Sequence, residues 1–340
     1  MMKFILFTIC FLHTYSLLAI PKKPIKVFSH PIRQIRFWDL PSQQSDQLVR
    51  PAGTAMIEYL NSYSRLNGHT DKIKSIPISS PGYKLVLKAF EQIPTKVKDL
   101  VRGKFLGIFL VKGLQTTGFA EYVQNARGRP MGGFIVLDWS KIVGKSANDF
   151  ASWKESLPFE DTLGEYRFKV KLEKDQDNNT TSAIRYILIH ELGHLISVGR
   201  GFHPSWWSHP KYFTNSTTSF PFTRLSWTTN VEKDRYQLKD EFQKEANVGF
   251  YRGKKLSAKL IEVVYKSMKV TPFPTLYSMQ NPFEDWADAF ANYVHTQILK
   301  RPFRVEIFKK GKLIHSASQC WNETRCFPKK KMLDRFLKTI

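Results

Sequence analysis

The sequence predicts an α+β fold in which a small mixed sheet precedes two long helices. Its 340 residues are 42% hydrophobic and 14% aromatic, so the chain can bury a substantial core. Two short apolar runs, over residues 105–111 and 132–138, have the composition of buried strands. Two segments with a helical spacing of apolar residues follow, over 181–198 and 281–299. Strands followed by helices favour an α+β domain with a helical C-terminal part.

The beginning of the chain is expected to be a signal peptide. Residues 1–19 contain one lysine, Lys3, no acidic residue, and an apolar run that ends at Ala19. A retained membrane anchor is the alternative, but the run is short for a span and is interrupted by His13 and Tyr15. No later stretch is apolar enough to cross a bilayer. We therefore expect a secreted or periplasmic protein with no transmembrane span after cleavage.

The mature chain is expected to contain one large domain after a short lead-in. Residues 20–60 begin with several prolines and basic residues, which indicates an irregular lead-in or a propeptide. Residues 61–340 are expected to form the domain itself. Its first predicted helix covers 85–101 and is disturbed by Pro94.

A long insertion is expected over residues 200–275, between the two main helices. It is rich in Trp, Phe, Pro, Ser and Thr, and contains one helical piece over 232–246. We interpret it as a candidate lid. Its aromatic side chains are expected to belong to the core, with substrate subsites as the alternative. These residues are Trp206, Trp207, Phe213, Phe220, Phe222 and Trp227.

The chain is strongly basic, with a formal net charge of +23. Much of this charge lies in a basic C-terminal tail over 300–340, which includes the run Lys329, Lys330 and Lys331. Such a field attracts polyanions. Because the chain has no recognisable nucleic-acid-binding motif and is expected to be exported, we expect an anionic envelope or cell-surface polymer as a partner rather than nucleic acid. Solubility alone is the alternative explanation.

Three cysteines are present, and Cys10 lies within the expected signal peptide. Cys320 and Cys326 remain, and in an oxidising compartment they could close a small loop near the C-terminus. Two free thiols are the alternative. Two cysteines cannot form a four-thiolate zinc site, so any metal must be held by other side chains.

The helix predicted over 181–198 contains the pattern H-E-x-x-H, formed by His190, Glu191 and His194. Residues four apart lie on the same face of a helix, so both imidazoles can reach one cation while Glu191 lies beside the open coordination position. This arrangement suits zinc, with Glu191 as the general base toward a metal-activated water. A chance occurrence is expected only about 0.02 times in a chain of this composition. Histidines that are merely hydrogen-bonded are the alternative.

A catalytic zinc site usually has three protein ligands, so a third must come from elsewhere in the chain. The metzincin pattern would place Gly and His three and six residues after His194, where this chain has Ser197 and Arg200. His203 is one candidate. We favour Glu284, which lies in the second predicted helix.

Glu284 and Asp288 are one turn apart in the helix predicted over 281–299, with Asn281 as its N-cap. Asp288 is placed to accept the ring N–H of a ligating histidine, which would orient that histidine. Two alternatives stay open: Glu284 could complete a capping box with Asn281, or Asp285 could be the ligand instead.

Together these two segments resemble the gluzincins, and most closely the catalytic domain of anthrax lethal factor and its bacterial relatives. The matching segments are His190-Glu191-Leu192-Gly193-His194 and Glu284-Asp285-Trp286-Ala287-Asp288-Ala289-Phe290. The resemblance implies a zincin-like metallopeptidase domain with one Zn²⁺ per chain, held by His190, His194 and Glu284. It also implies hydrolysis of peptide or protein substrates. In that family a tyrosine seven residues before the glutamate ligand stabilises the oxyanion, and Tyr277 stands at that position.

Zincins usually pair an extended substrate with a sheet edge beside the active-site helix, and we expect the strand over 132–138 to be that edge. Two other functions stay open because a fold does not define an activity. One is an inactive zincin scaffold that binds anionic envelope polymers, and the other is a zinc hydrolase that acts on cell-wall amides. Every expected catalytic position is intact, which favours an exported zinc peptidase.

Overall fold

The computed structural model describes most of the chain between residues 25 and 338. The described ranges are 25–44, 46–208, 210–213, 219–230, 232–233, 235–239, 248–251 and 255–338. The expected signal peptide over 1–19 lies outside them. Among the helices of these ranges, none has both the length and the hydropathy that a bilayer span requires.

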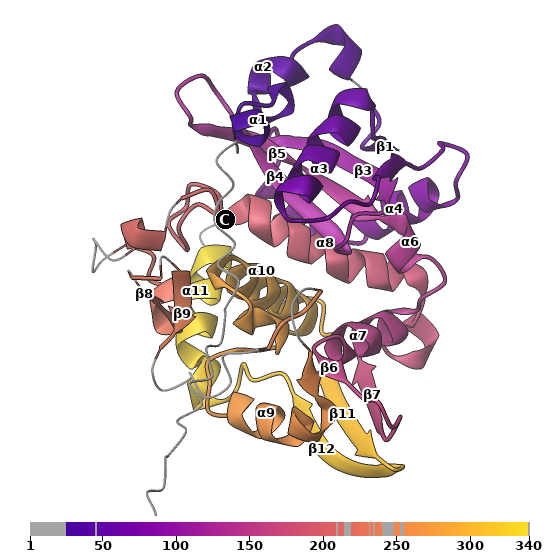
Figure 1. The fold of residues 1–340 in the computed structure, drawn as a ribbon, viewed down its shortest axis with the longest axis vertical. Helices are drawn as coiled ribbons and strands as arrows, with labels where there is room; N and C mark the ends of the chain where they lie inside the picture. Colours follow the sequence, from indigo (N-terminus) through magenta and orange to yellow (C-terminus); the bar gives the residue numbers. More distant parts are fainter. Residues whose placement is uncertain are drawn as a thin grey trace, which may run out of the picture.

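The fold is mixed α+β, as predicted (Figure 1). The larger sheet has the strand order β1-β3-β5-β4, with β2 beside β3. Strands β1, β3 and β5 are parallel, whereas β2 and β4 are antiparallel to their neighbours. The strands are β1 (Val49–Pro51), β2 (Lys74–Ser75), β3 (Phe105–Lys112), β4 (Gly118–Gln124) and β5 (Pro130–Asp138).

Alternate residues of the central strands face two separate cores, as the two-residue period of a strand requires. In β5, Ile135 and Leu137 belong to the core that contains α8, whereas Phe134 and Val136 face the core that contains α3. The second core is covered by the lead-in and the following helix, which are α1 (Ile25–Phe28), α2 (Ile35–Trp38) and α3 (Thr54–Leu66). The first is covered by α4 (Gly82–Glu91), α5 (Thr95–Asp99) and α8 (Thr180–Ser197).

Two local predictions are confirmed and one is wrong. Pro94 separates α4 from α5, so the helix expected over 85–101 is broken where predicted. The strand expected over 132–138 exists but is not an edge, because β3 and β4 pair with its two sides. Its continuous buried run, from Phe134 to Asp138, is typical of an interior strand. The edge beside α8 is β4, which the sequence did not reveal.

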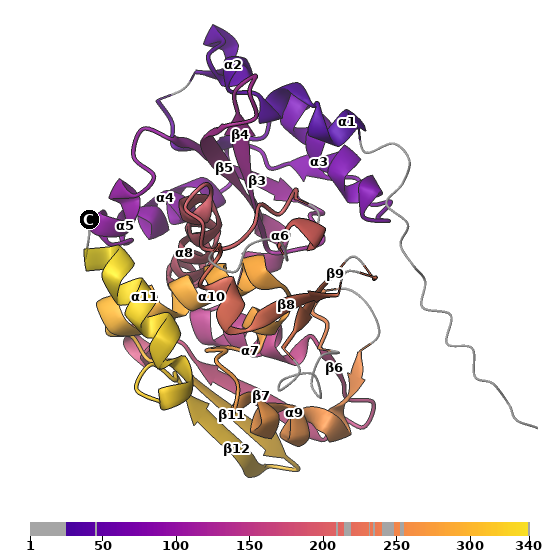
Figure 2. The ribbon, with the colours of Figure 1, turned by 90° about the vertical axis from the view of Figure 1, so that its left-hand side faces the viewer.

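Helix α8 separates the larger sheet from a C-terminal part, as both views show (Figures 1 and 2). On the far side of α8 lie α10 (Pro282–Tyr293), a π-helical turn (Val294–Ile298), α7 (Ala147–Ser156) and α11 (Phe327–Lys338). A three-stranded antiparallel sheet has the order β12-β11-β7. Its strands are β7 (Tyr166–Lys171), β11 (Arg304–Lys309) and β12 (Lys312–Ser318), and α9 (Ile261–Met268) lies beside it. The remaining short elements are α6 (Trp139–Ile142) and the pair β6 (Phe159–Glu160) and β10 (Leu256–Ser257).

The predicted insertion contains a hairpin, β8 (Trp227–Asn230) and β9 (Arg235–Leu238). The helix expected over 232–246 is therefore wrong at its start, and residues 240–247 lie outside the described ranges. Trp227 and Leu238 are directly opposite and both buried, so cross-strand packing outweighs the helical pattern of charges.

The basic C-terminal tail is not a free extension. Cys320 and Cys326 form a disulfide immediately before α11. Lys329, in the first turn of that helix, is completely buried. The tail is therefore part of the core that supports α10.

Candidate metal centre

The H-E-x-x-H segment lies in the second half of α8, as its sequence predicted. Asn179 caps this helix by accepting a hydrogen bond from the Ser182 backbone N–H. His190 and His194 follow each other by one turn, and their ring centroids are 4.9 Å apart. Both side chains are largely buried. The helical period alone therefore directs the two imidazoles to one point.

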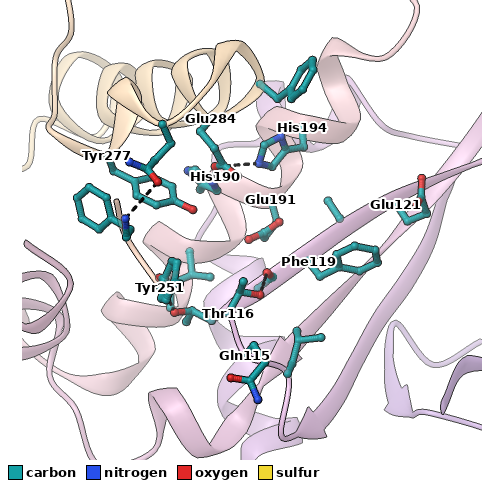
Figure 3. Close-up of a pocket in the computed structure, with 18 of the residues that line it drawn as sticks. Gln115, Thr116, Phe119, Glu121, His190, Glu191, His194, Tyr251, Tyr277 and Glu284 are labelled. Carbon is teal, nitrogen blue, oxygen red and sulfur yellow. Dashed lines mark hydrogen bonds and ion pairs between the residues drawn. The ribbon is translucent and has the colours of Figure 1, made fainter. Parts of the chain in front are cut away.

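Helix α10 brings Glu284 to these histidines. Asn281 caps the helix by accepting from the backbone N–H groups of Phe283 and Glu284 at 3.0 and 2.9 Å. The Glu284 carboxylate does not fold back as a capping box would require. Its Oε2 lies 3.0 Å from His190 Nε2 and 3.4 Å from His194 Nε2 (Figure 3).

The close approach of α8 and α10 depends on a small residue. A side chain on Gly193 would meet the backbone of Ala287 at 3.2 Å, which is tighter than ordinary packing. The Gly193 carbonyl also accepts a hydrogen bond from Trp286 Nε1 at 2.9 Å. Gly193 therefore fixes both the distance and the register of the two helices.

The three side chains fit a single metal ion. Their donor atoms all lie within 4.8 Å of one another, and they form the one such group found among the described residues. Two ligand atoms of one tetrahedral zinc lie about 3.3 Å apart, given bond lengths of about 2.0–2.2 Å. The observed separations of 3.0 and 3.4 Å agree with this value. His190, His194 and Glu284 are therefore the residues that could hold a metal.

His203, the alternative ligand, points elsewhere. Its Nε2 lies 2.7 Å from Ser197 Oγ and its Nδ1 lies 2.6 Å from the Pro204 carbonyl. Asp285, the other alternative, is fully buried and bonded to Lys329. Neither belongs to the group of possible ligands.

Asp288 lies behind the metal centre. Its Oδ1 is 3.1 Å from His190 Nδ1, and its other oxygen accepts from the Thr275 hydroxyl. A histidine whose Nδ1 donates to a carboxylate presents Nε2 to a metal. Asp288 therefore has the geometry to set the tautomer of His190.

The electrostatics of the site favour a cation between the ligands. Burial opposes the charge of His190, but hydrogen bonds to Asp288 and Glu284 outweigh it and raise its pKa to about 9. Burial likewise opposes the charge of Glu284, yet His194 and His190 hold its pKa well below the usual range. In the metal-free protein a proton on His190 therefore takes the place of the metal charge.

Glu191 projects from α8 toward the cavity and strand β4 (Figure 3). It is buried, and burial raises its pKa although the two histidines oppose this effect. Gly118, at the start of β4, faces it: a Cβ at this position would overlap the Glu191 carboxylate. Glycine at this position therefore leaves room for the present orientation of the Glu191 carboxylate.

Two tyrosines line the cavity, Tyr277 beside α10 and Tyr251 near Thr116 (Figure 3). The ring of Tyr277 is 5.7 Å from that of His190, and burial together with Glu284 holds its pKa well above the usual value, so its hydroxyl is a donor at neutral pH. Tyr251 also lines the cavity, and its hydroxyl is 3.0 Å from Thr117 Oγ1. Tyr251 was not predicted. It has a positive φ of 46°, a backbone state that no local sequence pattern reveals.

The cavity has a volume of about 470 Å³ and extends along the β4 edge. Trp206 and Trp207, from the insertion, line it, whereas Phe222 and Trp227 are buried in the core. The expectation that the insertion aromatics are core is thus correct for only some of them. Glu121 of β4, also unpredicted, accepts a hydrogen bond from Trp207 Nε1 at 3.0 Å and so anchors this wall.

The chain matches no protein-family model, no curated protein and no solved structure. What the site can do is therefore argued from its geometry. Two imidazoles and a carboxylate converge beside a buried glutamate, and a cavity lined by the edge strand β4 lies next to them.

Proposed function

We propose that this protein is an exported zinc-dependent peptidase of the gluzincin type, with a zincin-like fold similar to that of the lethal factor catalytic domain. The observation that carries the proposal is the convergence of His190, His194 and Glu284, from two helices far apart in the sequence, within 4.8 Å. Two imidazoles and one carboxylate are a donor set that suits zinc and leaves a position for substrate. When bound, zinc would supply Lewis acidity, polarising a carbonyl and acidifying water.

The residues of the chain supply the proton transfers. Glu191 takes the proton of the attacking water and returns it to the leaving amine, a role that its raised pKa supports. Tyr277 donates a hydrogen bond to the oxyanion that develops on the substrate carbonyl. Asp288 holds His190 in the tautomer that directs Nε2 toward the cavity.

The substrate is proposed to be a peptide in extended conformation that pairs with β4. This strand is the edge of the larger sheet and lines the cavity from Gly118 to Glu121. Gln124 at the end of this strand forms a bridge with Gln34, and the part that lines the cavity can offer backbone N–H and C=O groups to a peptide, which then adds as a further strand. The disulfide between Cys320 and Cys326 supports export, because such bonds persist in oxidising compartments.

The basic surface is proposed to hold the enzyme on an anionic envelope polymer. On the outer face of the small sheet, Arg167, Lys169 and Lys171 are exposed at alternate positions of β7, and Lys171 lies directly opposite Arg304. Glu306 of β11 lies opposite Lys169 and pairs with Arg304, so this face keeps an excess of positive charge that can attract an anionic polymer. Salt-sensitive retention on an anionic polymer resin should weaken when the three β7 residues become glutamate. The same change at exposed Lys84, Lys88 and Lys96 is the control.

The function is tested by zinc analysis and by cleavage of a peptide mixture, with and without chelator, beside a cell-wall substrate. We expect Glu191→Gln to keep zinc but lose hydrolysis by a factor of about 10³ or more, because the general base is removed. His194→Ala should lose both. Full activity of purified Glu191→Gln, or cleavage of wall material alone, would contradict the proposal.

A further inference from the structure

A single cationic side chain faces the cavity from α7. Lys154 is the one lysine or arginine among the described residues that line it. Its side chain is only 16% exposed, so nearly all of it is surrounded by protein. Its ammonium lies 3.6 Å from the centre of the Tyr277 ring, which places it beside the proposed oxyanion donor.

Lys154 is poorly provided with hydrogen bonds for a buried ammonium. The nearest carboxylate oxygen, Asp288 Oδ1, is 3.8 Å away, which is beyond hydrogen-bond distance. That oxygen already faces His190 Nδ1, and the second oxygen of Asp288 accepts from Thr275. Within the described residues the three N–H donors of Lys154 therefore have no close acceptor, and a group in the cavity can provide one.

The ammonium is nevertheless charged. Burial opposes its charge, but Asp288, Tyr251 and Glu284 outweigh this effect and raise its pKa. With a divalent ion on the ligands, the charges of the ion and Lys154 balance those of Glu191, Glu284 and Asp288. Apart from Glu155, whose pKa burial raises to about 7, the loaded site then has no net charge, so its charge does not exclude a further anion.

The walls near Lys154 define the shape of that anion. Phe150 of α7 and Ile187 of α8 are apolar, while the hydroxyls of Thr117 and Tyr251 lie on the β4 side. Apolar walls with one cation at the end suit a short aliphatic stem that ends in a carboxylate.

We propose that Lys154 binds a substrate carboxylate, so that the enzyme prefers an acidic group close to the cleaved bond. This inference rests on the proposed function. The carboxylate can come from an aspartate or glutamate side chain, or from the C-terminus of a short peptide. The first source makes the enzyme an acid-selective endopeptidase, and the second makes it a carboxypeptidase.

The two sources are separated by binding measurements on zinc-loaded Glu191→Gln protein, which does not depend on hydrolysis. Calorimetry compares two peptide pairs: glutamate against glutamine at each position around the cleaved bond, and a free against an amidated C-terminus. We expect one pair to differ by about tenfold or more in Kd, because the neutral member leaves Lys154 unpaired. In the double variant Glu191→Gln/Lys154→Met the ratio of the Kd values of the neutral and the acidic peptide should fall to about one. Lys154→Arg in the same background should restore part of this ratio.

Lys145→Met is the matched control, since Lys145 is also half-buried and lies 5.3 Å from an aromatic ring, that of Trp153, but does not line the cavity. It should keep the full ratio. If Lys154→Met fails to fold or to retain zinc, Lys154→Gln takes its place. The inference would be overturned if the protein showed no carboxylate preference, or if the preference remained in both Lys154→Met and Lys154→Gln. Absence of all hydrolysis in the unsubstituted enzyme would instead contradict the proposed function.

Discussion

The two helices that meet at the candidate metal centre are held by different kinds of interaction. Helix α8 is buried along almost its whole length, mainly by apolar side chains such as Ile184, Leu188 and Leu192. Helix α10 is also buried, but it carries several polar side chains, each with a partner on another element. These pairs are Glu284 with His190 and His194, Asp285 with Lys329 and Trp227, Asp288 with His190 and Thr275, and Asn292 with Trp321.

This difference indicates which mutations are expected to disturb the candidate site most. Apolar packing is non-directional, whereas a buried ion pair or hydrogen bond is costly when one partner is lost. His190 and His194 are placed relative to each other by the helix itself. The position of Glu284 depends on the polar partners of α10 as well as on its apolar packing, so we expect this third candidate ligand to be the most sensitive to mutation.

Lys329→Met removes the ion pair that Lys329 forms with Asp285 of α10 and leaves the residues of α8 unchanged. Lys329 and Asp285 are both completely buried, with Nζ 2.5 and 2.7 Å from the two carboxylate oxygens. Removing the lysine leaves a buried charge, and we expect a loss of about 3–5 kcal/mol in the free energy of unfolding at pH 7. Urea denaturation measures this loss, and zinc affinity should fall with it.

The control for this change is Lys331→Met, two residues along the same helix and exposed. The free energy of unfolding of Lys331→Met should differ from that of the unsubstituted protein by no more than about 0.5 kcal/mol. Burial raises the pKa of Asp285 to about 6 although Lys329 opposes it. Because Lys329 opposes this rise, its removal raises the pKa of Asp285 further, and protonation of Asp285 as the pH falls should reduce the deficit of Lys329→Met. Equal effects of the two substitutions would show that α10 is not held by this ion pair.

Tyr277→Phe tests the segment that leads into α10. Removing the hydroxyl of Tyr277, the proposed oxyanion donor, should lower kcat by a factor of about 10²–10³ with zinc retained. Tyr251→Phe, in the same cavity, is the comparison, because its hydroxyl is paired with Thr117 and we expect a smaller loss. Steady-state kinetics with metal analysis distinguishes the two, and an unchanged kcat in Tyr277→Phe would remove its assigned role.

The contact between the two helices should make zinc binding depend on pH. Asp288 and Glu284 outweigh burial and raise the pKa of His190 to about 9, so zinc must displace its proton. The proton stabilises the metal-free protein fully below about pH 6.5, and this contribution is lost as the pH rises through 9. Apparent zinc affinity should therefore rise about tenfold per pH unit between these values, as competition with a chelator would show. A zinc affinity that does not change with pH would contradict the expected displacement of a proton from His190.

Gly118→Ala perturbs the α8 side of the site alone. The new Cβ would displace the Glu191 carboxylate, so hydrolysis should fall by about tenfold while zinc content is unchanged. Gly53→Ala is the control, because a Cβ there meets nothing within 4 Å. Loss of zinc in Gly118→Ala would mean that β4 supports the ligands as well as the base.

The same difference between the helices explains what the sequence could predict. The spacing of His190, Glu191 and His194 is local, and so is the N-cap of α10, so both followed from short patterns. Glu284 was favoured from its one-turn spacing to Asp288, and the resemblance to a known family supported this choice. The meeting of the two helices depends on Gly193 and on buried partners from distant segments.

Other parts of the site had no local signal. Strand β4 mixes half-buried and buried residues and begins with Gly118, so no strand pattern was evident there, and the strand over 132–138 was expected to be the edge instead. Lys154 and Tyr251 belong to the cavity only through the packing of α7 and the insertion. A glutamate such as Glu121 is usually expected at the surface. In the structure it is fully buried, and its carboxylate accepts hydrogen bonds from Tyr59 and Trp207.

The most direct test of the metal centre is an anomalous diffraction map of the zinc-loaded protein, recorded on both sides of the zinc edge. We predict one peak about 2.0–2.2 Å from the Nε2 atoms of His190 and His194 and from the Glu284 carboxylate. A peak elsewhere, or a Glu284 side chain turned away from both histidines, would contradict the account.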